Sequence, residues 1–225
     1  VGGKGETRKG RAVLDGWMGD GSGTGRTGEE GSETSYACVV EQWGNGCSAT
    51  PSEFAIMSSR VPSLGIVISG RGTSNWMERN HPSSIDPRKR PRLTPNPAMA
   101  FKNGKLLMPF GTPGGDVQAQ AMVQTFLNIA EFGMDPQAAV DAPRFISWNF
   151  PNSFWPHAYY PGLVGVEGRI PAHTLAELER RGHKLELWDD FAVKMGSLCA
   201  IKVDQATGGL SAGADPRRDG YAMGR

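Results

Sequence analysis

The chain has 225 residues, 38% of them hydrophobic, and a formal net charge of +1 from 24 basic and 23 acidic residues. The length fits one large domain or two small ones, and the balanced charge favours neither nucleic acid nor an acidic membrane surface as a partner. No apolar run approaches the roughly 20 residues that span a bilayer. We therefore expect a globular chain with no nucleic-acid and no membrane partner.

Residues 1–33 are rich in glycine and charge and contain no proline. Such a segment buries too little apolar surface to offset its ordering entropy, so we expect it to be flexible. The pattern changes at Thr34. Residues 35–40 are predicted to form a β-strand, residues 43–46 a hairpin turn and residues 47–50 the return strand.

Thr34 is a candidate nucleophile because of this junction. A flexible segment that leads directly into a strand beginning with Thr is what a self-cleaving precursor needs. Cleavage before Thr34 would free an α-amine, with an ordinary pKa of about 7.7 to 8.0, that could act as the base for the Thr34 hydroxyl. The alternative is that residues 1–33 are a disordered tail and that Thr34 is only the first strand residue.

The next segment, residues 51–97, is rich in proline and carries a basic cluster at residues 88–92. A charge run of this kind is usually a solvated loop. The functional alternative is that the loop borders the site, with Thr94 bonded to an acyl intermediate. Strands are then predicted at residues 99–101 and 106–110 around a turn.

The second of these strands leads into the loop Gly111-Thr112-Pro113-Gly114-Gly115-Asp116. Apolar spacing predicts a helix over residues 117–132, with Asp116 as its N-cap. Gly114 and Gly115 let the backbone approach a ligand, and a helix N-terminus offers unpaired N–H groups to an anion or a developing oxyanion. A tight turn that merely enters a helix is the plain alternative.

Further along the chain, Asp135 and Pro136 predict the start of a short helix, and Pro171 predicts the start of another. The aromatic residues 146–162 are interpreted as an insertion over the edge of the fold, with an aromatic pocket wall as the alternative. Strands are predicted at residues 185–188, 198–203 and 210–214. Strands in successive hairpins favour a layered α+β sandwich over a parallel βαβ sheet.

Cys38, Cys47 and Cys199 all fall on predicted strands and are odd in number. We expect buried free thiols, which favour a reducing compartment such as the cytoplasm. The four histidines lack metal-ligand spacing, so no metal is expected. No Gly-x-Ser-x-Gly elbow nominates a serine for a catalytic triad, although triads are recognised by geometry.

Eight segments occur in the order and rough spacing of the small subunit of γ-glutamyltransferases, which are N-terminal-nucleophile hydrolases. From about Glu33 onward, the chain resembles this family. The segments are Thr34-Ser35-Tyr36, Gly44-Asn45, Lys89-Arg90-Pro91, Gly111-Thr112-Pro113-Gly114-Gly115, Phe132-Gly133-Met134, Asp141-Ala142-Pro143-Arg144-Phe145, Gly182-His183 and Asp215-Pro216-Arg217-Arg218.

The resemblance implies a precursor that cleaves itself before Thr34 into two subunits, which together build a four-layer αββα sandwich. This chain would supply about half of that α+β fold. Residues 1–33 would be the flexible end of the large-subunit half, and residues 34–225 the small-subunit, catalytic half.

The chain also departs from the family's pattern. Ser35-Tyr36 stands in place of a Thr and a His, Ser52-Glu53-Phe54 in place of Thr-Leu-Asn, and Leu93-Thr94 in place of paired serines. Residues 66–72 lack the Met-Asp-Asp-Phe whose Asp holds the amino group of the glutamyl substrate. The resemblance therefore implies a retained catalytic framework with the glutamyl-recognising residues replaced.

We thus expect an amide hydrolase or acyltransferase in which Thr34 attacks an amide carbonyl and the N–H groups of Gly114 and Gly115 hold the oxyanion. The predicted partners are the large-subunit half of the same precursor and a small-molecule amide or γ-glutamyl compound such as glutathione. No cofactor is expected. The alternatives are a non-catalytic or unprocessed homologue whose loop binds an anion or a partner, and an acylase for a non-glutamyl amide. Candidate substrate-binding residues are Ser35, Thr50, Ser52 and Thr94.

Overall fold

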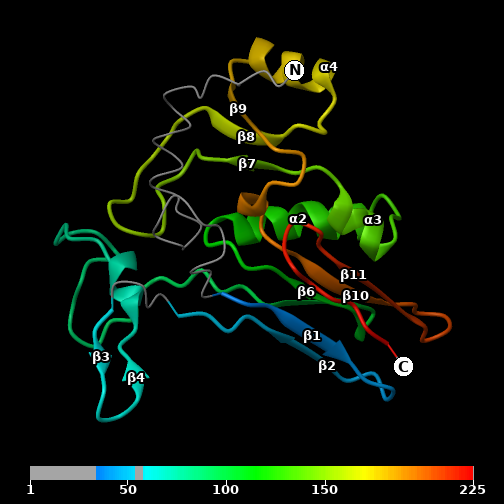
Figure 1. Cartoon of the computed structure of the whole chain (residues 1–225), viewed down its shortest axis with the longest axis horizontal. Helices are drawn as coiled ribbons and strands as arrows, with labels where there is room; N and C mark the ends of the chain where they lie inside the picture. Colours follow the sequence, from blue (N-terminus) through cyan, green and yellow to red (C-terminus); the bar gives the residue numbers. More distant parts are fainter. Residues whose placement is uncertain (1–33, 54–57, 225) are drawn as a thin grey trace, which may run out of the picture.

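The computed structural model describes residues 34–53 and 58–224, so the Gly-rich segment 1–33 predicted to be flexible lies outside the described residues. Four antiparallel strands form the largest sheet, in the order β11 (Leu210–Ala214), β10 (Cys199–Val203), β6 (Lys105–Gly111) and β5 (Ala98–Lys102). Figure 1 shows this sheet in the lower half of the molecule.

The hairpin of β1 (Ala37–Val40) and β2 (Gly46–Ala49) packs on one side of this sheet, against β6 and β10. The helices α2 (Val117–Ala130) and α3 (Pro136–Asp141) lie on the other side (Figure 1). The layer order is therefore hairpin, sheet, helices.

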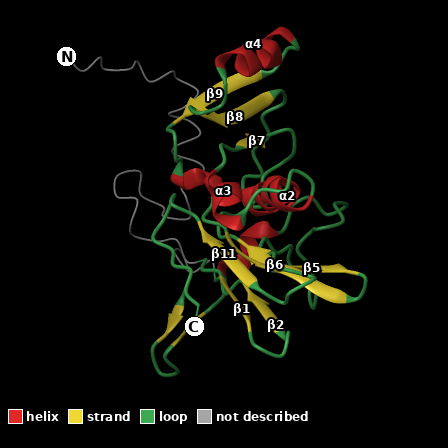
Figure 2. Cartoon of the chain, turned by 90° about the vertical axis from the view of Figure 1, so that its right-hand side faces the viewer, coloured by secondary structure: helices red, strands yellow, loops and turns green. Residues whose placement is uncertain are grey.

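Beyond the helices lies a second sheet, in the order β7 (Phe145–Ser147), β8 (Leu163–Glu167) and β9 (Lys184–Trp188), with α4 (Ala172–Arg180) at its far end (Figure 2). A small hairpin of β3 (Arg60–Val61) and β4 (Ile66–Val67), and the short 3-10 helices η1 (Gly70–Ser74) and η2 (Val193–Met195), complete the described elements. None of the helices in the described ranges is both long and apolar enough to cross a membrane.

Helix α2 has apolar side chains on two faces, which explains its place between the sheets. One face contributes Met122 and Ile129 to the core of the large sheet, which also holds Met108, Phe110 and Leu198. The other face contributes Val117 and Ala121 to a second core. That core is completed by Ile146, Trp148, Trp188, Ala192 and Met195.

The local signals predicted most of these elements. The β1–β2 hairpin forms with Ala37 opposite Ala49, and the strands predicted at residues 99–101 and 106–110 pair as β5 and β6. The Asp135 carboxylate caps α3 by accepting the N–H groups of Gln137 and Ala138 at 3.0 and 3.1 Å. Helix α4 begins one residue after Pro171.

The preference for hairpins over a βαβ unit was wrong at one place. Strands β8 and β9 are parallel, with α4 as their crossover. Strand β8 was missed because its apolar run follows directly on the aromatic segment that was interpreted as an insertion. Gly165 in this strand lies close to Trp188 and Ile146, since a Cβ at Gly165 would come within 2.8 Å of the Trp188 ring.

All three cysteines are free thiols on strands, as predicted, but they are not all buried. Cys38 and Cys199 are partly buried, whereas Cys47 is exposed. Successive residues of a strand point to opposite faces, and the strand prediction did not say which face of β2 meets the protein interior.

Two of the segments that carry the family resemblance meet in a buried ionic cluster of Arg144, Glu167, Asp215 and Arg217. Arg144 Nη2 lies 2.6 Å from Asp215 Oδ2, and Arg217 contacts Glu167 at 2.5 Å and Asp215 at 3.0 Å. Backbone groups complete the cluster: the N–H of Leu198 donates to Asp215, and the N–H of Ala192 donates to Glu167. The cluster ties the ends of α3 and β8 to the chain on both sides of β10 and β11.

Candidate active site

The site begins where the chain enters β1. Thr34 and Ser52 lie opposite each other in an isolated antiparallel bridge, and the N–H of Ser35 donates to the carbonyl of Pro51 at 3.0 Å. This pairing extends the β1–β2 hairpin by a few residues and places Thr34 Oγ1 2.7 Å from Ser52 Oγ. Both residues are partly buried. Two of the predicted site residues are therefore in direct contact.

Arg71, in η1, joins these hydroxyls to a third. Its Nη2 donates to Ser52 Oγ at 2.5 Å, and its Nη1 donates to Thr94 Oγ1 at 3.1 Å. The side chain is buried, with the residue only 6% exposed. We call Thr34, Ser52, Arg71 and Thr94 the hydroxyl cluster.

Arg71 is the member of this cluster that the sequence analysis missed. The available signal was a basic residue in the stretch 66–72, where the family carries an acidic one. Arginines are mostly exposed, however, and nothing in the sequence pattern indicates that this side chain turns inward. The three hydroxyl residues of the cluster were predicted.

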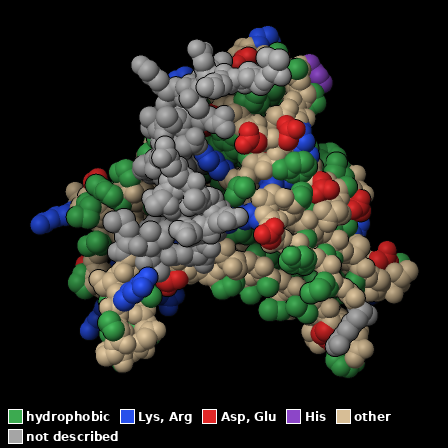
Figure 3. All heavy atoms as spheres, in the orientation of Figure 1, with side chains coloured by type: hydrophobic (Ala, Val, Ile, Leu, Met, Phe, Trp, Pro, Cys, Tyr) green, Lys and Arg blue, Asp and Glu red, His purple; other side chains and the backbone are tan. Residues whose placement is uncertain are grey.

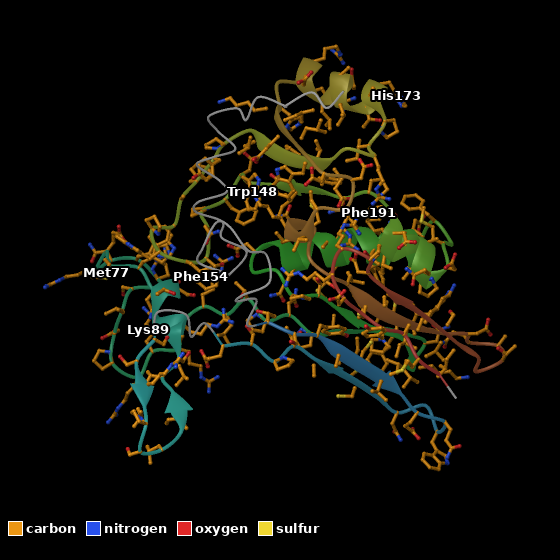
Figure 4. The ribbon with its side chains drawn as sticks, viewed as in Figure 1. Met77, Lys89, Trp148, Phe154, His173 and Phe191 are labelled. Atoms are coloured by element: carbon orange, nitrogen blue, oxygen red, sulfur yellow. The ribbon has the colours of Figure 1, made fainter. Side chains whose placement is uncertain are left out.

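Phe154 connects the hydroxyl cluster to the loop before α2. The guanidinium carbon of Arg71 lies 5.7 Å from the centroid of the Phe154 ring. On the other side, a Cβ placed on Gly115 would be in ordinary contact with that ring, at 3.8 Å. Figure 4 labels Phe154 on the side of the molecule where η1 and the first turn of α2 lie. The aromatic segment thus lies against the site, in accord with the pocket-wall alternative.

The loop Gly111–Asp116 has positive φ angles at its two adjacent glycines, as a Gly-Gly pair before a helix predicted. Gly114 has φ +128° and Gly115 has φ +55°, both conformations that L-residues with side chains rarely adopt. Two hydrogen bonds of the Thr112 side chain hold the loop in place: Oγ1 donates to the Pro113 carbonyl and accepts the N–H of Ser197, both at 2.7 Å. Gly114 and Gly115 are partly exposed.

Asp116 does not cap α2 with its side chain, which corrects the sequence prediction. Its carboxylate instead accepts the N–H of Ser153 at 2.6 Å and the Ser153 hydroxyl. Arg92 lies 3.7 Å from the same carboxylate. A bond from the chain 37 residues away replaces the local cap, because residues 152–154 pass directly over the start of the helix. Asp116 therefore anchors the segment that carries Phe154.

Tyr36 supports the loop from the hairpin side. Its ring packs so closely on Gly111, the last residue of β6, that a Cβ there would come within 2.3 Å of Tyr36 Cε2. The hydroxyl bonds to Ser48 Oγ at 2.7 Å, and burial raises the pKa of Tyr36 well above its ordinary value. The residue that replaces the family's histidine thus has a packing role.

Within the described residues, the side chains of the other two predicted residues make no hydrogen bond to the hydroxyl cluster. Ser35 is exposed, and it is its backbone that contacts Pro51. Thr50 Oγ1 is buried and has no hydrogen-bond partner among residues 34–53 and 58–224. The same residues contain no group of three or more His, Cys, Asp or Glu side chains placed to hold a metal ion.

Comparison with known proteins gives a consistent result. The family model described as Gamma-glutamyltranspeptidase matches residues 12–225. The glutathione hydrolase-like YwrD proenzyme of Bacillus subtilis is 38% identical over 196 residues, which are 86% of this chain and 36% of that protein. The oxamate amidohydrolase proenzyme of Klebsiella pneumoniae is 30% identical over 197 residues, covering 85% of this chain and 35% of that protein. The chain spans about a third of the length of the curated relatives that it matches.

Among solved structures, a gamma-glutamyltranspeptidase from Pseudomonas nitroreducens superposes with a TM-score of 0.69 at 22% identity. The match covers 85% of this chain and 100% of that chain. At this identity the likeness shows the fold alone, and it confirms the predicted α+β fold of the N-terminal-nucleophile hydrolases.

Proposed function

Because the chain belongs to the gamma-glutamyltranspeptidase family, we propose that it carries the catalytic half of an amide hydrolase or acyltransferase whose nucleophile is Thr34. The observation that carries the proposal is the 2.7 Å contact between Thr34 Oγ1 and Ser52 Oγ, beside a buried arginine. A hydroxyl held by a second hydroxyl at the start of a strand has a fixed position, which a nucleophile requires.

The proposed reaction begins with cleavage of the bond between Glu33 and Thr34. The freed α-amine accepts the proton of the Thr34 hydroxyl while Oγ1 attacks the substrate's amide carbon. The N–H groups of Gly114 and Gly115 hold the oxyanion, which collapses as the substrate amine leaves with the proton. Water or an amine acceptor then resolves the acyl ester and restores Thr34.

The acyl group is better matched by an amide without a glutamyl ammonium than by glutathione. The stretch Ile66-Val67-Ile68-Ser69-Gly70-Arg71-Gly72 contains no carboxylate. The guanidinium of its one charged residue has only donors, so it cannot accept a hydrogen bond from a substrate ammonium. One relative is named an oxamate amidohydrolase, and oxamate is an amide without an ammonium group; another relative is named an acylase.

A large-subunit half is the proposed protein partner. The relatives named above are proenzymes about three times as long as the matched segment. On the described surface, Trp43 at the hairpin tip is 79% exposed and Phe101 in β5 is 62% exposed. Figure 3 shows hydrophobic side chains over the region where Figure 1 places β1 and β10. Apolar surface of this kind marks a site of association.

Mass spectrometry and N-terminal sequencing of the whole protein that contains this chain test the proposal. The expected product has a new terminus that begins Thr-Ser-Tyr. Thr34→Ala should stay uncut and inactive toward amides, whereas Thr34→Ser should retain slow cleavage because a hydroxyl remains. Thr174→Ala, which removes an exposed hydroxyl on α4, is the matched control.

Normal cleavage and turnover by Thr34→Ala would refute the proposed nucleophile. A wild-type protein that remains one intact chain would instead favour the non-catalytic alternative, in which the loop Gly111–Asp116 binds an anion or a partner.

A further inference from the structure

Arg71 fixes the direction of the hydrogen bonds in the hydroxyl cluster. A guanidinium stays protonated and offers only donors, so Ser52 Oγ and Thr94 Oγ1 must both act as acceptors toward it. Hydrogen bonds donated by a cation are stronger than those between neutral groups. One lone pair of Ser52 is therefore committed to Arg71.

This commitment determines what Ser52 does to Thr34. The single hydroxyl proton of Ser52 is available to Thr34 Oγ1, 2.7 Å away. A hydroxyl that accepts from a cation is polarised and becomes a stronger donor in its next bond. The arrangement Arg71 to Ser52 to Thr34 is thus favoured over one in which Thr34 donates to an oxygen already bonded to a cation.

We infer that Arg71, acting through Ser52, is a positioning residue that holds Thr34 Oγ1 as an acceptor and directs the Thr34 proton toward its own α-amine. The inference rests on the proposed function, because it gives the Thr34 hydroxyl the direction that attack requires. The positive charge also lies one hydroxyl away from the atom that must lose its proton, so it favours the deprotonated form.

The surroundings hold Arg71 in this role. At the start of η1 its backbone N–H donates to Ser69 Oγ at 3.3 Å, and the turn closes with the N–H of Asn75 on the Gly72 carbonyl at 3.0 Å. The Phe154 ring lies under the Arg71 guanidinium, and Nη1 of that guanidinium donates to Thr94 Oγ1. The planar guanidinium of Arg71 donates to two fixed acceptors at once, and a lysine ammonium cannot reproduce that two-armed geometry.

The test compares Arg71→Met and Arg71→Lys in the whole protein that contains this chain. Arg79→Met removes an exposed arginine of the same region and serves as the control. The rate of cleavage before Thr34 is followed by mass, and kcat and KM are measured with an acyl anilide. Both constants are normalised to the amount of chain that begins at Thr34.

We expect Arg71→Met to slow self-cleavage and to lower kcat by about 10- to 100-fold, with KM changed less than kcat. The rising limb of kcat/KM against pH should move to higher pH, because loss of a nearby cation makes the α-amine easier to protonate. Arg71→Lys keeps the charge and should restore the position of that limb, with only part of kcat.

A purely structural role would give a different pattern. Both variants would then lose activity in proportion to melting temperature, and the pH limb would stay in place. That pattern, or normal cleavage and kcat in Arg71→Met, overturns the inference. If Arg71→Met melts too low to assay, the pH limb of Arg71→Lys decides: a shift to higher pH while the charge is retained also overturns it. Failure of the proposed function is separate, since it appears as an active Thr34→Ala.

Discussion

Two regions of this molecule bury arginine side chains, and the side chains that these arginines contact differ in kind. In the ionic cluster, Arg144 and Arg217 lie against Glu167 and Asp215, so two positive charges meet two negative ones. In the hydroxyl cluster, Arg71 donates to the neutral hydroxyls of Ser52 and Thr94. In the first arrangement the guanidinium groups pair with carboxylates, whereas in the second a guanidinium contacts the hydroxyl that lies 2.7 Å from the candidate nucleophile.

The difference separates structural from chemical motifs. Asp-Ala-Pro-Arg-Phe and Asp-Pro-Arg-Arg are among the segments that carried the family resemblance, yet their charged side chains hold chain segments together inside the fold. Arg71 came from a stretch that appeared only as a departure. A residue that belongs to a family motif is therefore not by that fact a site residue, and the partners of its side chain decide the matter.

The largest effect should come from breaking the ionic cluster. Asp215→Asn leaves Arg144 and Arg217 with too little negative charge in a buried site, and removing one partner of a buried pair costs about 3 to 5 kcal/mol. Burial already lowers the pKa of Arg144, and the attraction of Asp215 opposes that change. The free energy of unfolding, measured with denaturant, should fall by this amount.

The control for this experiment is Glu177→Gln, which breaks an exposed pair with Arg180 and Arg181 on α4. Surface pairs contribute little to stability, so the unfolding midpoint should stay in place. Equal midpoints for Asp215→Asn and Glu177→Gln would remove the contrast between the two buried clusters.

The next effect concerns turnover. If the N–H groups of Gly114 and Gly115 hold an oxyanion, Gly115→Ala should lower kcat by about 10²- to 10³-fold, the cost of one lost oxyanion donor. Gly115 has φ +55°, so alanine must strain or move the backbone there. The substitution should cost about 1 to 2 kcal/mol of stability, less than its effect on turnover.

Gly133 offers a matched control for Gly115. It has φ +70° just after α2, and a Cβ placed there meets nothing within 4 Å. Gly133→Ala should therefore lower the melting temperature to a similar extent and leave kcat unchanged. If Gly115→Ala also turns over normally, the loop is only the entry to a helix.

A smaller effect should separate anchoring from capping at Asp116. Asparagine caps helices as well as aspartate does, so Asp116→Asn would be neutral if the side chain were a cap. Asparagine has one acceptor oxygen where aspartate has two, so it can accept the Ser153 N–H only with its NH2 group facing the Ser153 hydroxyl, and the bonds to a charged carboxylate, which contribute about 1.5 to 3 kcal/mol, are lost. We expect lower stability together with a higher KM, because Phe154 follows Ser153.

Asp135→Asn is the corresponding control, since Asp135 accepts two N–H groups at the start of α3. The melting temperature of the Asp135→Asn variant should hardly change, because asparagine is also a good N-cap. Two variants with equal melting temperatures and equal KM would restore the capping interpretation of Asp116.

The sequence predicted those features that depend on local pattern. The β1–β2 hairpin, the cap of α3 and the start of α2 follow from turn residues, capping residues and apolar spacing within a few positions. Thr34 and the glycine loop followed from the change of pattern at residue 34 and from the glycines that precede a predicted helix, and the resemblance agreed with both. These predictions needed no knowledge of what lies opposite each residue.

The missed features all depend on contacts between distant segments. Arg71 joins the hydroxyl cluster through Ser52 and Thr94, 19 and 23 positions away. The Asp116 side chain accepts from Ser153, 37 positions away, and does not cap α2. Strand β8 pairs with β9, which follows it after the intervening helix α4. Propensity and spacing carry no information on such pairings, so a single sequence could not have predicted them.

The smallest expected effect is a difference in reactivity between the exposed thiol and the two partly buried ones. Cys38 lies in β1, a few residues after Thr34, and Cys199 lies in β10 beside Asp215. Burial raises the pKa of Cys38 to about 11 and also raises that of Cys199, whereas Cys47 is exposed. Near neutral pH, a thiol whose pKa is two units above its ordinary value holds about 100-fold less of the reactive thiolate.

In the described fold, Cys47 should therefore react first with a disulfide reagent near pH 8, and Cys38 should accelerate as the pH rises toward 11. Peptide mapping after timed labelling identifies each thiol. Asp215→Asn should speed labelling of Cys199 more than that of Cys38, because the carboxylate that is removed lies beside Cys199 and raises its pKa. Equal acceleration of both thiols would show that the two buried regions open together, and the distinction between them would then fail. Slow labelling of Cys47 in the whole protein, with fast labelling after unfolding, would instead show that a partner segment covers β2.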